Sequence, residues 1–397
     1  MADAADPMLT AAQRERIEAR THPAYRADID GLRAVAVVPV VLYHAGVRGF
    51  SGGFVGVDIF FVISGFLITG ILVRDVAIGR HSILEFYRRR ILRIFPALIA
   101  VMVATTIGAW YFLLPSEMGR YATSLGAAAV FVSNVQFYLS TDYFNLGALS
   151  QPLLHTWSLA VEEQWYVLWP LIIAAIGPRR PRSMLGLTIA LTVGSLLFSL
   201  WLLPRDPAAT FYLLPTRAWE LGLGALLAIA APPQLPRWAR ESLGLVGLAL
   251  IAFAVKTYTH DTPFPGLAAV PPCLGATLLL MTGRDNTLVA RALSIAPLRF
   301  IGLISYSMYL WHWPILVFAA TGVFLTKGFG ATVMLLLIIL AVSTLSWRFV
   351  ERPFRSGLSG WRTSRVLAGG GAAIAAMVAL AVATPMIART LVPYTQT

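Results

Sequence analysis

The fold class of this chain is decided by its first long apolar stretch, Asp30-Gly-Leu-Arg33-Ala-Val-Ala-Val-Val-Pro39-Val-Val-Leu-Tyr43-His44. A helix turns about 100° per residue, so the step from Arg33 to His44 covers three turns plus roughly 20°. Both side chains therefore share one face, about 16 Å apart along the helix. An ionisable group inside a bilayer costs roughly 2.5–3.5 kcal/mol and often marks a functional site. The alternative is an arginine that reaches one interface and a histidine that caps the far helix end.

Composition extends this interpretation to the whole chain. Of the 397 residues, 57% are hydrophobic and only 13% are charged, whereas soluble domains carry about 25% charged residues. Long apolar runs recur from end to end, which predicts an all-α polytopic integral membrane protein in a lipid bilayer. The net charge of +12 lies mostly in short loops between apolar runs, a pattern typical of membrane topology and not of a nucleic-acid partner. The single cysteine, Cys273, excludes a disulfide within these residues, and no metal site is expected.

Twelve apolar segments are candidate spans. They are residues 30–46, 53–74, 96–115, 121–140, 155–177, 184–203, 217–231, 240–257, 266–283, 300–320, 330–350 and 364–386. Five basic clusters lie between them and should be cytoplasmic. The clusters are Arg80 with Arg88, Arg89, Arg90 and Arg93; Arg179, Arg180 and Arg182; Arg237 and Arg240; Arg284, Arg291 and Arg299; and Arg348, Arg352 and Arg355.

One candidate span conflicts with this orientation. Three apolar segments lie between the first and second basic clusters, although two cytoplasmic loops require an even number of crossings. The stretch 121–155 is rich in Ser, Asn, Gln and Tyr and includes the polar linker Thr141–Asn145, so we expect it to be re-entrant or non-spanning. About ten membrane helices and an eleventh C-terminal span then remain. The N-terminus is predicted to be cytoplasmic and Leu391–Thr397 extracytoplasmic.

A carboxylate is expected beside His44. Asp58 lies in Gly56-Val-Asp58-Ile-Phe-Phe, across a short turn from His44, where it could orient the imidazole as a general base. The alternative is that Asp58 caps its own helix. Gly65, two turns further on, would allow close helix packing.

A dense arginine cluster follows this second span, in Glu85-Phe-Tyr-Arg88-Arg89-Arg90-Ile-Leu-Arg93-Ile-Phe-Pro96. Arg89 and Arg90 lie four and three residues before Arg93, so the three line adjacent faces of a cytoplasmic helix. Guanidinium groups bind phosphate oxygens bidentately, which favours a polyphosphate ligand. The alternative is a topology signal that binds anionic lipid heads.

A second polar constellation opens a later span, in His155-Thr-Trp157-Ser158-Leu-Ala-Val-Glu162-Glu163-Gln-Trp165-Tyr166. Carboxylates at membrane depth are costly unless they line an aqueous pocket. An interfacial aromatic belt would explain the tryptophans but not the carboxylates. Glu162 and Tyr166 are four apart and share one helix face.

Three further motifs carry polar residues. Arg217 and Glu220 are three apart and able to pair. His312 follows Ser305-Tyr306-Ser307-Met-Tyr309-Leu-Trp311 inside a span that Pro314 should kink. Glu351-Arg-Pro353-Phe is expected to be a structural stop at a helix end.

As an ordered set from about Tyr25 to Phe354, these motifs resemble the acyltransferase-3 family of bacterial integral-membrane acyltransferases. The resemblance implies ten membrane helices and transfer of an acyl group, usually acetyl from cytoplasmic acetyl-CoA, to a hydroxyl of a carbohydrate outside the bacterial cytoplasmic membrane. It assigns catalysis to His44 with Arg33, and acyl-CoA binding to Arg89, Arg90 and Arg93. No permanently bound cofactor is expected.

The remaining assignments come from the motifs themselves. Asp58 should orient His44, and Glu162 should hold or deprotonate the acceptor. The expected acceptor or pocket residues are His155, Trp157, Ser158, Tyr166, Arg217, Glu220, Tyr309 and His312. His44 acts either as a general base or as an acyl carrier. A proton-coupled transporter of a sugar or lipid-linked intermediate and a non-catalytic export partner are the competing functions.

The expected organisation is a cytoplasmic tail over 1–24, an acyltransferase-3 membrane domain over 25–355, and a C-terminal part over 356–397. That last part comprises a linker, the extra transmembrane helix and the start of an extracytoplasmic segment. The chain resembles the subgroup in which an SGNH esterase-like domain follows the membrane domain. No Gly-Asp-Ser element occurs after residue 350, so we expect the SGNH domain to be absent from this chain.

Overall fold

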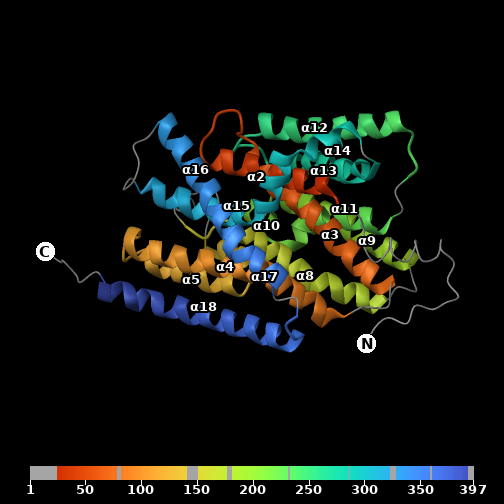
Figure 1. The fold of residues 1–397 in the computed structure, drawn as a ribbon. Helices are drawn as coiled ribbons and strands as arrows, with labels where there is room; N and C mark the ends of the chain where they lie inside the picture. The colour runs from red at the N-terminus through yellow and green to blue at the C-terminus, as the bar shows by residue number, and fades with distance from the viewer. Residues whose placement is uncertain are drawn as a thin grey trace.

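The computed structural model describes residues 25–77, 82–140, 151–176, 181–230, 233–285, 287–321, 328–357 and 360–391. Within these ranges the chain is helical with connecting turns and contains no strand, and the long helices pack side by side in one bundle (Figure 1). Some predictions lie outside the described residues. These are the tail 1–24, the linker Thr141–Asn145, Arg80, Arg179, Arg180 and the residues after Leu391.

The longer helices alternate with short connecting ones. The longer helices are α2 (Ala27–His44), α3 (Gly56–Ala77), α4 (Ile83–Phe112), α8 (Thr156–Ile176), α9 (Pro181–Leu202), α11 (Leu214–Ile229), α12 (Arg237–Thr257), α13 (Val270–Thr282), α15 (Ala296–Ala320), α16 (Phe329–Ser346) and α18 (Thr363–Leu391). The short ones are α5 (Met118–Ala129), α6 (Ser133–Ser140), α10 (Pro207–Tyr212), α14 (Leu288–Leu293) and α17 (Arg352–Gly357). Four shorter segments complete the described chain: η1 (Gly53–Val55), η2 (Gly266–Ala269), η3 (Gly283–Asp285) and the π-helical η4 (Trp347–Glu351).

Eight helices in the described chain are long and apolar enough to cross a membrane. They are α3 with η1, α4, α8, α9, α12, α15, α16 with the segments that follow it, and α18. Length and composition alone do not identify α2, α11 or α13 as membrane spans. Helix α2 carries Asp28, Asp30 and Arg33 in 18 residues, and α11 and α13 are shorter. The predicted class, an all-α polytopic membrane protein, is confirmed.

The stretch after α4 is broken where a membrane span would have to be continuous. Helices α5 and α6 have 12 and 8 residues, which at 1.5 Å per residue reach about 18 and 12 Å, well short of a roughly 30 Å hydrocarbon core. Between them the backbone of Phe131 is left-handed, with φ of +57°. Up to Ser140, this agrees with the predicted non-spanning segment.

The arginine motif and the following span form one helix, not a cytoplasmic helix followed by a span from residue 96. Helix α4 runs unbroken for 30 residues, and its N-terminus is capped by the Ser82 hydroxyl, which accepts a hydrogen bond from the Glu85 amide at 3.2 Å. At 1.5 Å per residue the helix is about 45 Å long. Its first three turns carry the arginines to one end of the bundle as part of the spanning helix itself.

Glycines set the closest helix contacts around the site. A Cβ added to Gly65 on α3 would lie 1.9 Å from the Leu221 carbonyl oxygen of α11, and one on Gly224 would lie 2.0 Å from the Val62 carbonyl oxygen. The close packing predicted for Gly65 is confirmed. Helix α15 approaches α2 in the same way, since a Cβ on Gly302 would lie 1.8 Å from the Asp30 carbonyl oxygen. These contacts fix which faces of α2 and α3 meet α15 and α11.

The C-terminal helix lies at the edge of the bundle. Helix α18 packs along α4 and α5, at the lower border of Figure 1, and buries Ala381 and Ala388 there. By length and composition it is able to span, as predicted for the eleventh segment.

Candidate functional site

Two cavities lie along the α2–α3–α15 core. The first has a volume of about 330 Å³, and we call it the arginine cavity. Its polar lining comprises Arg33, Ser64, Arg89, Arg90, Arg93, Ser158, Glu162, Tyr166, Ser305, Tyr306 and Tyr309. The second has a volume of about 520 Å³, and we call it the histidine cavity. Its polar and aromatic lining includes Tyr43, His44, Asp58, His155, Trp157, Arg217, His260, Tyr309 and Trp313.

Arg33 and His44, which are predicted to share one face of α2, line different cavities. Arg33 lines the arginine cavity, and His44, three turns further along the same helix, lines the histidine cavity. Val57 and Tyr309 line both. The cavities therefore meet at these two side chains. Along α2, one cavity lies at Arg33 and the other at His44.

The arginines of the first cavity are not equivalent. Arg89 is bound to Asp75 at 2.7 Å and its side chain is 44% exposed. Arg90 pairs with Glu163 at 3.2 Å and stacks on the Tyr166 ring at 4.0 Å. These two guanidinium groups are already engaged by protein groups.

Arg93 differs from both neighbours. Within the described ranges the structure assigns it no hydrogen bond and no ion pair, although it lines the cavity. The positive charges of Arg33, Arg90 and Arg355 act on it, and so do the negative charges of Glu351 and Glu163. Arg33 makes a long contact to Asp30 at 3.5 Å, and the negative charges of Glu351 and Glu162 also act on it. An anion that entered this cavity would therefore meet Arg93 and Arg33.

Asp30 anchors the start of α2 at this end. It accepts a hydrogen bond from the Tyr25 hydroxyl, and burial together with this carboxylate raises the pKa of Tyr25 to about 12. Arg26 and Asp28 form a second pair there at 2.6 Å. The beginning of α2 is thereby held by ionic contacts on the arginine side of the bundle.

Glu162 does not lie where the sequence placed it. It lines the arginine cavity, not an outward acceptor pocket, and it accepts hydrogen bonds from the Ser64 hydroxyl at 2.9 Å and the Tyr166 hydroxyl at 3.2 Å. The hydrogen bond confirms that Glu162 and Tyr166 share one face of α8, as predicted. The placement was wrong because Glu162 is two turns of α8 beyond His155, and that distance carries it from one cavity to the other.

His44 has a histidine beside it, not the predicted aspartate. Its Nδ1 lies 3.2 Å from Nε2 of His312, and the two rings stack with centroids 5.2 Å apart. The Trp313 ring meets the His44 ring edge-on at 4.8 Å. On the other side of His312, its Nδ1 lies 2.6 Å from the backbone carbonyl oxygen of Tyr309. His155 completes the group, with its ring centroid 5.9 Å from that of His312.

Asp58 instead belongs to a buried ionic group. Arg217 donates to Asp58 at 2.7 Å and pairs with Glu220 at 2.9 Å, and all three side chains are essentially unexposed. The predicted Arg217–Glu220 pair is confirmed. The prediction that Asp58 orients His44 was wrong, because nearness along the turn does not decide which face of α3 carries Asp58, and that face packs on α11.

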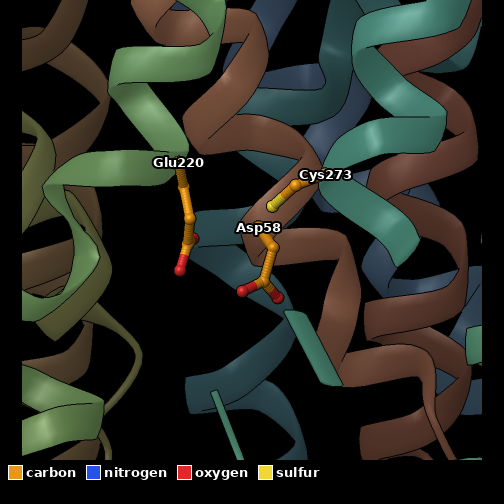
Figure 2. Close-up of side chains that lie close together, drawn as sticks. All are labelled: Asp58, Glu220 and Cys273. Carbon is orange, nitrogen blue, oxygen red and sulfur yellow. The ribbon is translucent and has the colours of Figure 1, made fainter. Parts of the chain in front are cut away.

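Figure 2 shows Cys273 of α13 directed toward Asp58, with the Glu220 side chain of α11 on the other side. Their ligand atoms lie within 4.8 Å of one another, a spacing that a metal ion could use. The Arg217 guanidinium already supplies the positive charge, and it sits within 6 Å of the Phe61, Trp157, Phe211 and Phe264 rings. We interpret the group as an ionic anchor between α3 and α11.

Tyr309 occupies the junction of the two cavities. Its hydroxyl donates to the His155 carbonyl oxygen at 3.0 Å and lies 2.6 Å from the Ser158 hydroxyl. The Ser158 hydroxyl also lies 3.4 Å from the same carbonyl oxygen, so the two hydroxyls and the carbonyl form one hydrogen-bonded group. The start of α8 and the middle of α15 are thereby joined where the cavities meet.

Glu351 is a residue of this region that the sequence does not single out. Its motif predicts a structural stop, but Glu351 is buried in the π-helical η4, where Ser307 donates to it at 3.2 Å and Arg355 at 3.3 Å. Its charge acts on Arg33 and Arg93. A carboxylate next to a basic cluster was a signal, and single-turn π segments are common at functional sites. The expected kink at Pro314 does not interrupt α15, which continues to Ala320.

The family described as the acyltransferase domain matches residues 26–348, which includes both cavities. The chain belongs to this family. It is 33% identical over 362 residues to O-acetyltransferase OatA of Staphylococcus aureus, covering 86% of this chain and 59% of that protein. It is also 33% identical to peptidoglycan O-acetyltransferase OatA of Listeria monocytogenes, covering 83% of this chain and 56% of that protein.

A third relative is matched along most of its length. The provisionally named membrane-bound transacylase BcsY of Komagataeibacter xylinus is 33% identical over 334 residues, covering 82% of each chain. The chain spans somewhat under three fifths of the length of the two OatA proteins. No solved structure matches. The protein is thus a multi-pass membrane member of an acyltransferase family whose relatives here are bacterial.

Proposed function

We propose that this protein transfers an acetyl group from cytoplasmic acetyl-CoA to a hydroxyl of a carbohydrate on the outer side of the bacterial cytoplasmic membrane. The observation that carries the proposal is the pair of cavities that share Val57 and Tyr309, one lined by arginines and the other by histidines. The names of the OatA relatives support O-acetylation, and one of them names peptidoglycan as the substrate.

The donor is assigned to the arginine cavity by charge. CoA carries phosphate groups, and guanidinium groups bind phosphate oxygens with charge-assisted hydrogen bonds. Within the described residues Arg93 makes no hydrogen bond or ion pair and the Arg33–Asp30 contact is 3.5 Å long, whereas Arg90 is held directly by Glu163 and Tyr166. We therefore assign phosphate binding to Arg93 and Arg33, and the shaping of the cavity wall to Arg90. Glu162 lies on this donor side, where it could accept a hydrogen bond from an amide of the donor arm.

We infer the orientation from the basic residues. Arg355 acts electrostatically on Arg33 and Arg93, and Arg299 acts together with Arg33 on Tyr25 before α2. Basic residues concentrate on the cytoplasmic side of membrane proteins. The arginine cavity then faces the cytoplasm, with the N-terminus on that side, and the histidine cavity faces outward. This orientation would let a long, thin acyl-pantetheine arm reach the junction at Tyr309 from inside while the acceptor enters from outside.

His44 is the proposed catalytic base. The acceptor oxygen attacks the thioester carbonyl carbon while its proton passes to the free ring nitrogen of His44. A C–O bond forms and the C–S bond breaks, and the imidazolium returns the proton to the departing CoA thiolate. The products are the acetyl ester and free CoA thiol, and His44 ends neutral.

The proposal is tested with purified protein in detergent. Calorimetry measures acetyl-CoA binding, and a thiol assay measures the CoA released after acetyl-CoA is added. Wild type should bind acetyl-CoA and release CoA, Arg93→Ala should bind acetyl-CoA more weakly, and His44→Ala should bind it but release CoA far more slowly. Arg237→Ala is the matched control, because Arg237 is a 73% exposed arginine on α12 that lines neither cavity. A well-folded wild type that binds no CoA would contradict the proposal and favour the transporter.

A further inference from the structure

Histidines 44, 155 and 312 lie close together beside the histidine cavity. Of these three, only His44 and His155 line it. His312 is 0% exposed. Its two ring nitrogens are both in contact with protein atoms, the Tyr309 carbonyl oxygen and the His44 ring. A buried imidazole that does not face the cavity needs a role other than contact with the acceptor.

The hydrogen bonds fix the proton positions in this chain of groups. A backbone carbonyl oxygen only accepts, so Nδ1 of His312 must carry the proton that it donates to Tyr309 at 2.6 Å. In a neutral imidazole the other nitrogen then has a free lone pair. Nε2 of His312 therefore accepts, and Nδ1 of His44 donates to it across 3.2 Å.

This arrangement determines which ring nitrogen of His44 can react. With the proton on Nδ1, its Nε2 is the nitrogen with the lone pair, and it is available to the histidine cavity that His44 lines. A carboxylate commonly plays the part of the orienting group in acid–base catalysis. Here Asp58 is bound by Arg217, and no carboxylate within the described residues hydrogen-bonds to either histidine.

The ring positions are held by packing as well as by hydrogen bonds. Tyr43 and Trp313 contact the His44 ring at centroid distances of 5.0 and 4.8 Å. The close approach of α15 to α2 at Gly302 keeps the helices that carry the two histidines in fixed register. The His44–His312 contact thus belongs to a rigid part of the bundle.

We propose that His312 is a positioning residue that locks His44 in the Nδ1-protonated tautomer and so presents Nε2 as the reactive nitrogen. The catalytic consequence rests on the proposed function, but the tautomer itself does not. The same nitrogen is reactive whether His44 acts as a base or carries the acyl group, because both need its lone pair.

Two substitutions separate the contacts of His312. In His312→Gln the side-chain oxygen reaches the former Nε2 position and still accepts from His44. In His312→Asn the shorter amide reaches only the former Nδ1 position, so the contact with Tyr309 is kept and the contact with His44 is lost. We expect His312→Gln to lose at most about threefold in kcat, and His312→Asn to lose on the order of 10- to 100-fold with little change in KM.

The tautomer is read directly from ¹⁵N-histidine NMR of the purified protein, with the His44 signals identified by their loss in His44→Gln. Wild type and His312→Gln should show a neutral His44 protonated at Nδ1, and His312→Asn should show a mixture of tautomers. Acetyl-CoA binding by each variant serves as the folding control.

Each outcome decides the proposal. A wild-type His44 protonated at Nε2, a charged His312, or equal losses in both variants with CoA binding intact would overturn it. If neither variant folds, the wild-type spectrum alone decides. If wild type transfers no acetyl group, the proposed function fails while the spectrum still tests the tautomer.

Discussion

The arginine cavity and the histidine cavity share two wall residues and yet handle charge in opposite ways. In the arginine cavity, Arg93 makes no ion pair within the described residues and the Arg33–Asp30 contact is long, at 3.5 Å, so both guanidinium groups can still bind an anion. In the histidine cavity, the charged groups Asp58 and Arg217 are paired with each other and with Glu220, and the groups that contact His44 are a histidine ring and aromatic rings. The difference indicates that one cavity is suited to hold an anion and the other to move a proton.

The largest effect on activity is expected when the proton acceptor of the histidine cavity is removed. His44→Ala should lower acetyl transfer by on the order of 100- to 10,000-fold, because general-base catalysis contributes about that much. Donor binding should stay at the wild-type level, since His44 does not line the arginine cavity. The measurement is single-turnover transfer beside calorimetric binding. Transfer at the wild-type rate would remove His44 from the mechanism.

The next effect tests whether the Asp58 group is an anchor or part of the chemistry. Arg217→Ala leaves two carboxylates buried without a partner, and the free energy of unfolding should fall by roughly 3–5 kcal/mol. Thermal unfolding in detergent gives the shift. Arg217→Ala combined with Asp58→Asn and Glu220→Gln should recover part of the loss. If Arg217→Ala alone is as stable as wild type but inactive, Arg217 acts in catalysis.

A smaller effect is expected from the charge of the arginine cavity. Arg93→Ala should raise the acetyl-CoA dissociation constant about 10- to 100-fold, because one charge-assisted hydrogen bond contributes roughly 1.5–3 kcal/mol. The effect should shrink as salt is added, since ions screen the attraction. The control is Arg237→Ala on the exposed start of α12. Unchanged donor affinity in Arg93→Ala would place the phosphates elsewhere.

The smallest effect concerns the residue that both cavities share. Tyr309→Phe removes the hydroxyl that joins Ser158 to the His155 carbonyl but keeps the ring. We expect a two- to tenfold loss in kcat, which corresponds to about 0.5–1.5 kcal/mol for one hydrogen bond. Ser158→Ala should give a similar loss. A loss above a hundredfold in Tyr309→Phe alone would mean that the hydroxyl contacts the reacting atoms.

Contacts within one helix could be predicted from the sequence. Arg217 with Glu220 and Glu162 with Tyr166 are three and four residues apart, and both pairs are present. The helical period alone brings such residues together, whatever the helix packs against. The same period placed Arg33 and His44 on one face of α2, and they open into the two cavities.

Contacts between helices could not be predicted. His44 meets His312, 268 residues away, and Asp58 meets Arg217, 159 residues away. Asp58 is close to His44 in sequence, yet the face of α3 that carries it packs on α11. Glu351 stood beside a basic cluster in the sequence, but only the π-helical segment turns it inward to Ser307.

By itself the sequence determined that this is an all-α membrane protein, where its basic residues concentrate, and which polar groups lie on each helix. Those properties depend on hydropathy and on the geometry of a single helix, which are local. The tertiary structure decided which polar groups became partners, because partner choice depends on how each helix is rotated against its neighbours. That rotation is set by close backbone contacts, such as Gly65 on Leu221 and Gly302 on Asp30, between residues far apart in the chain.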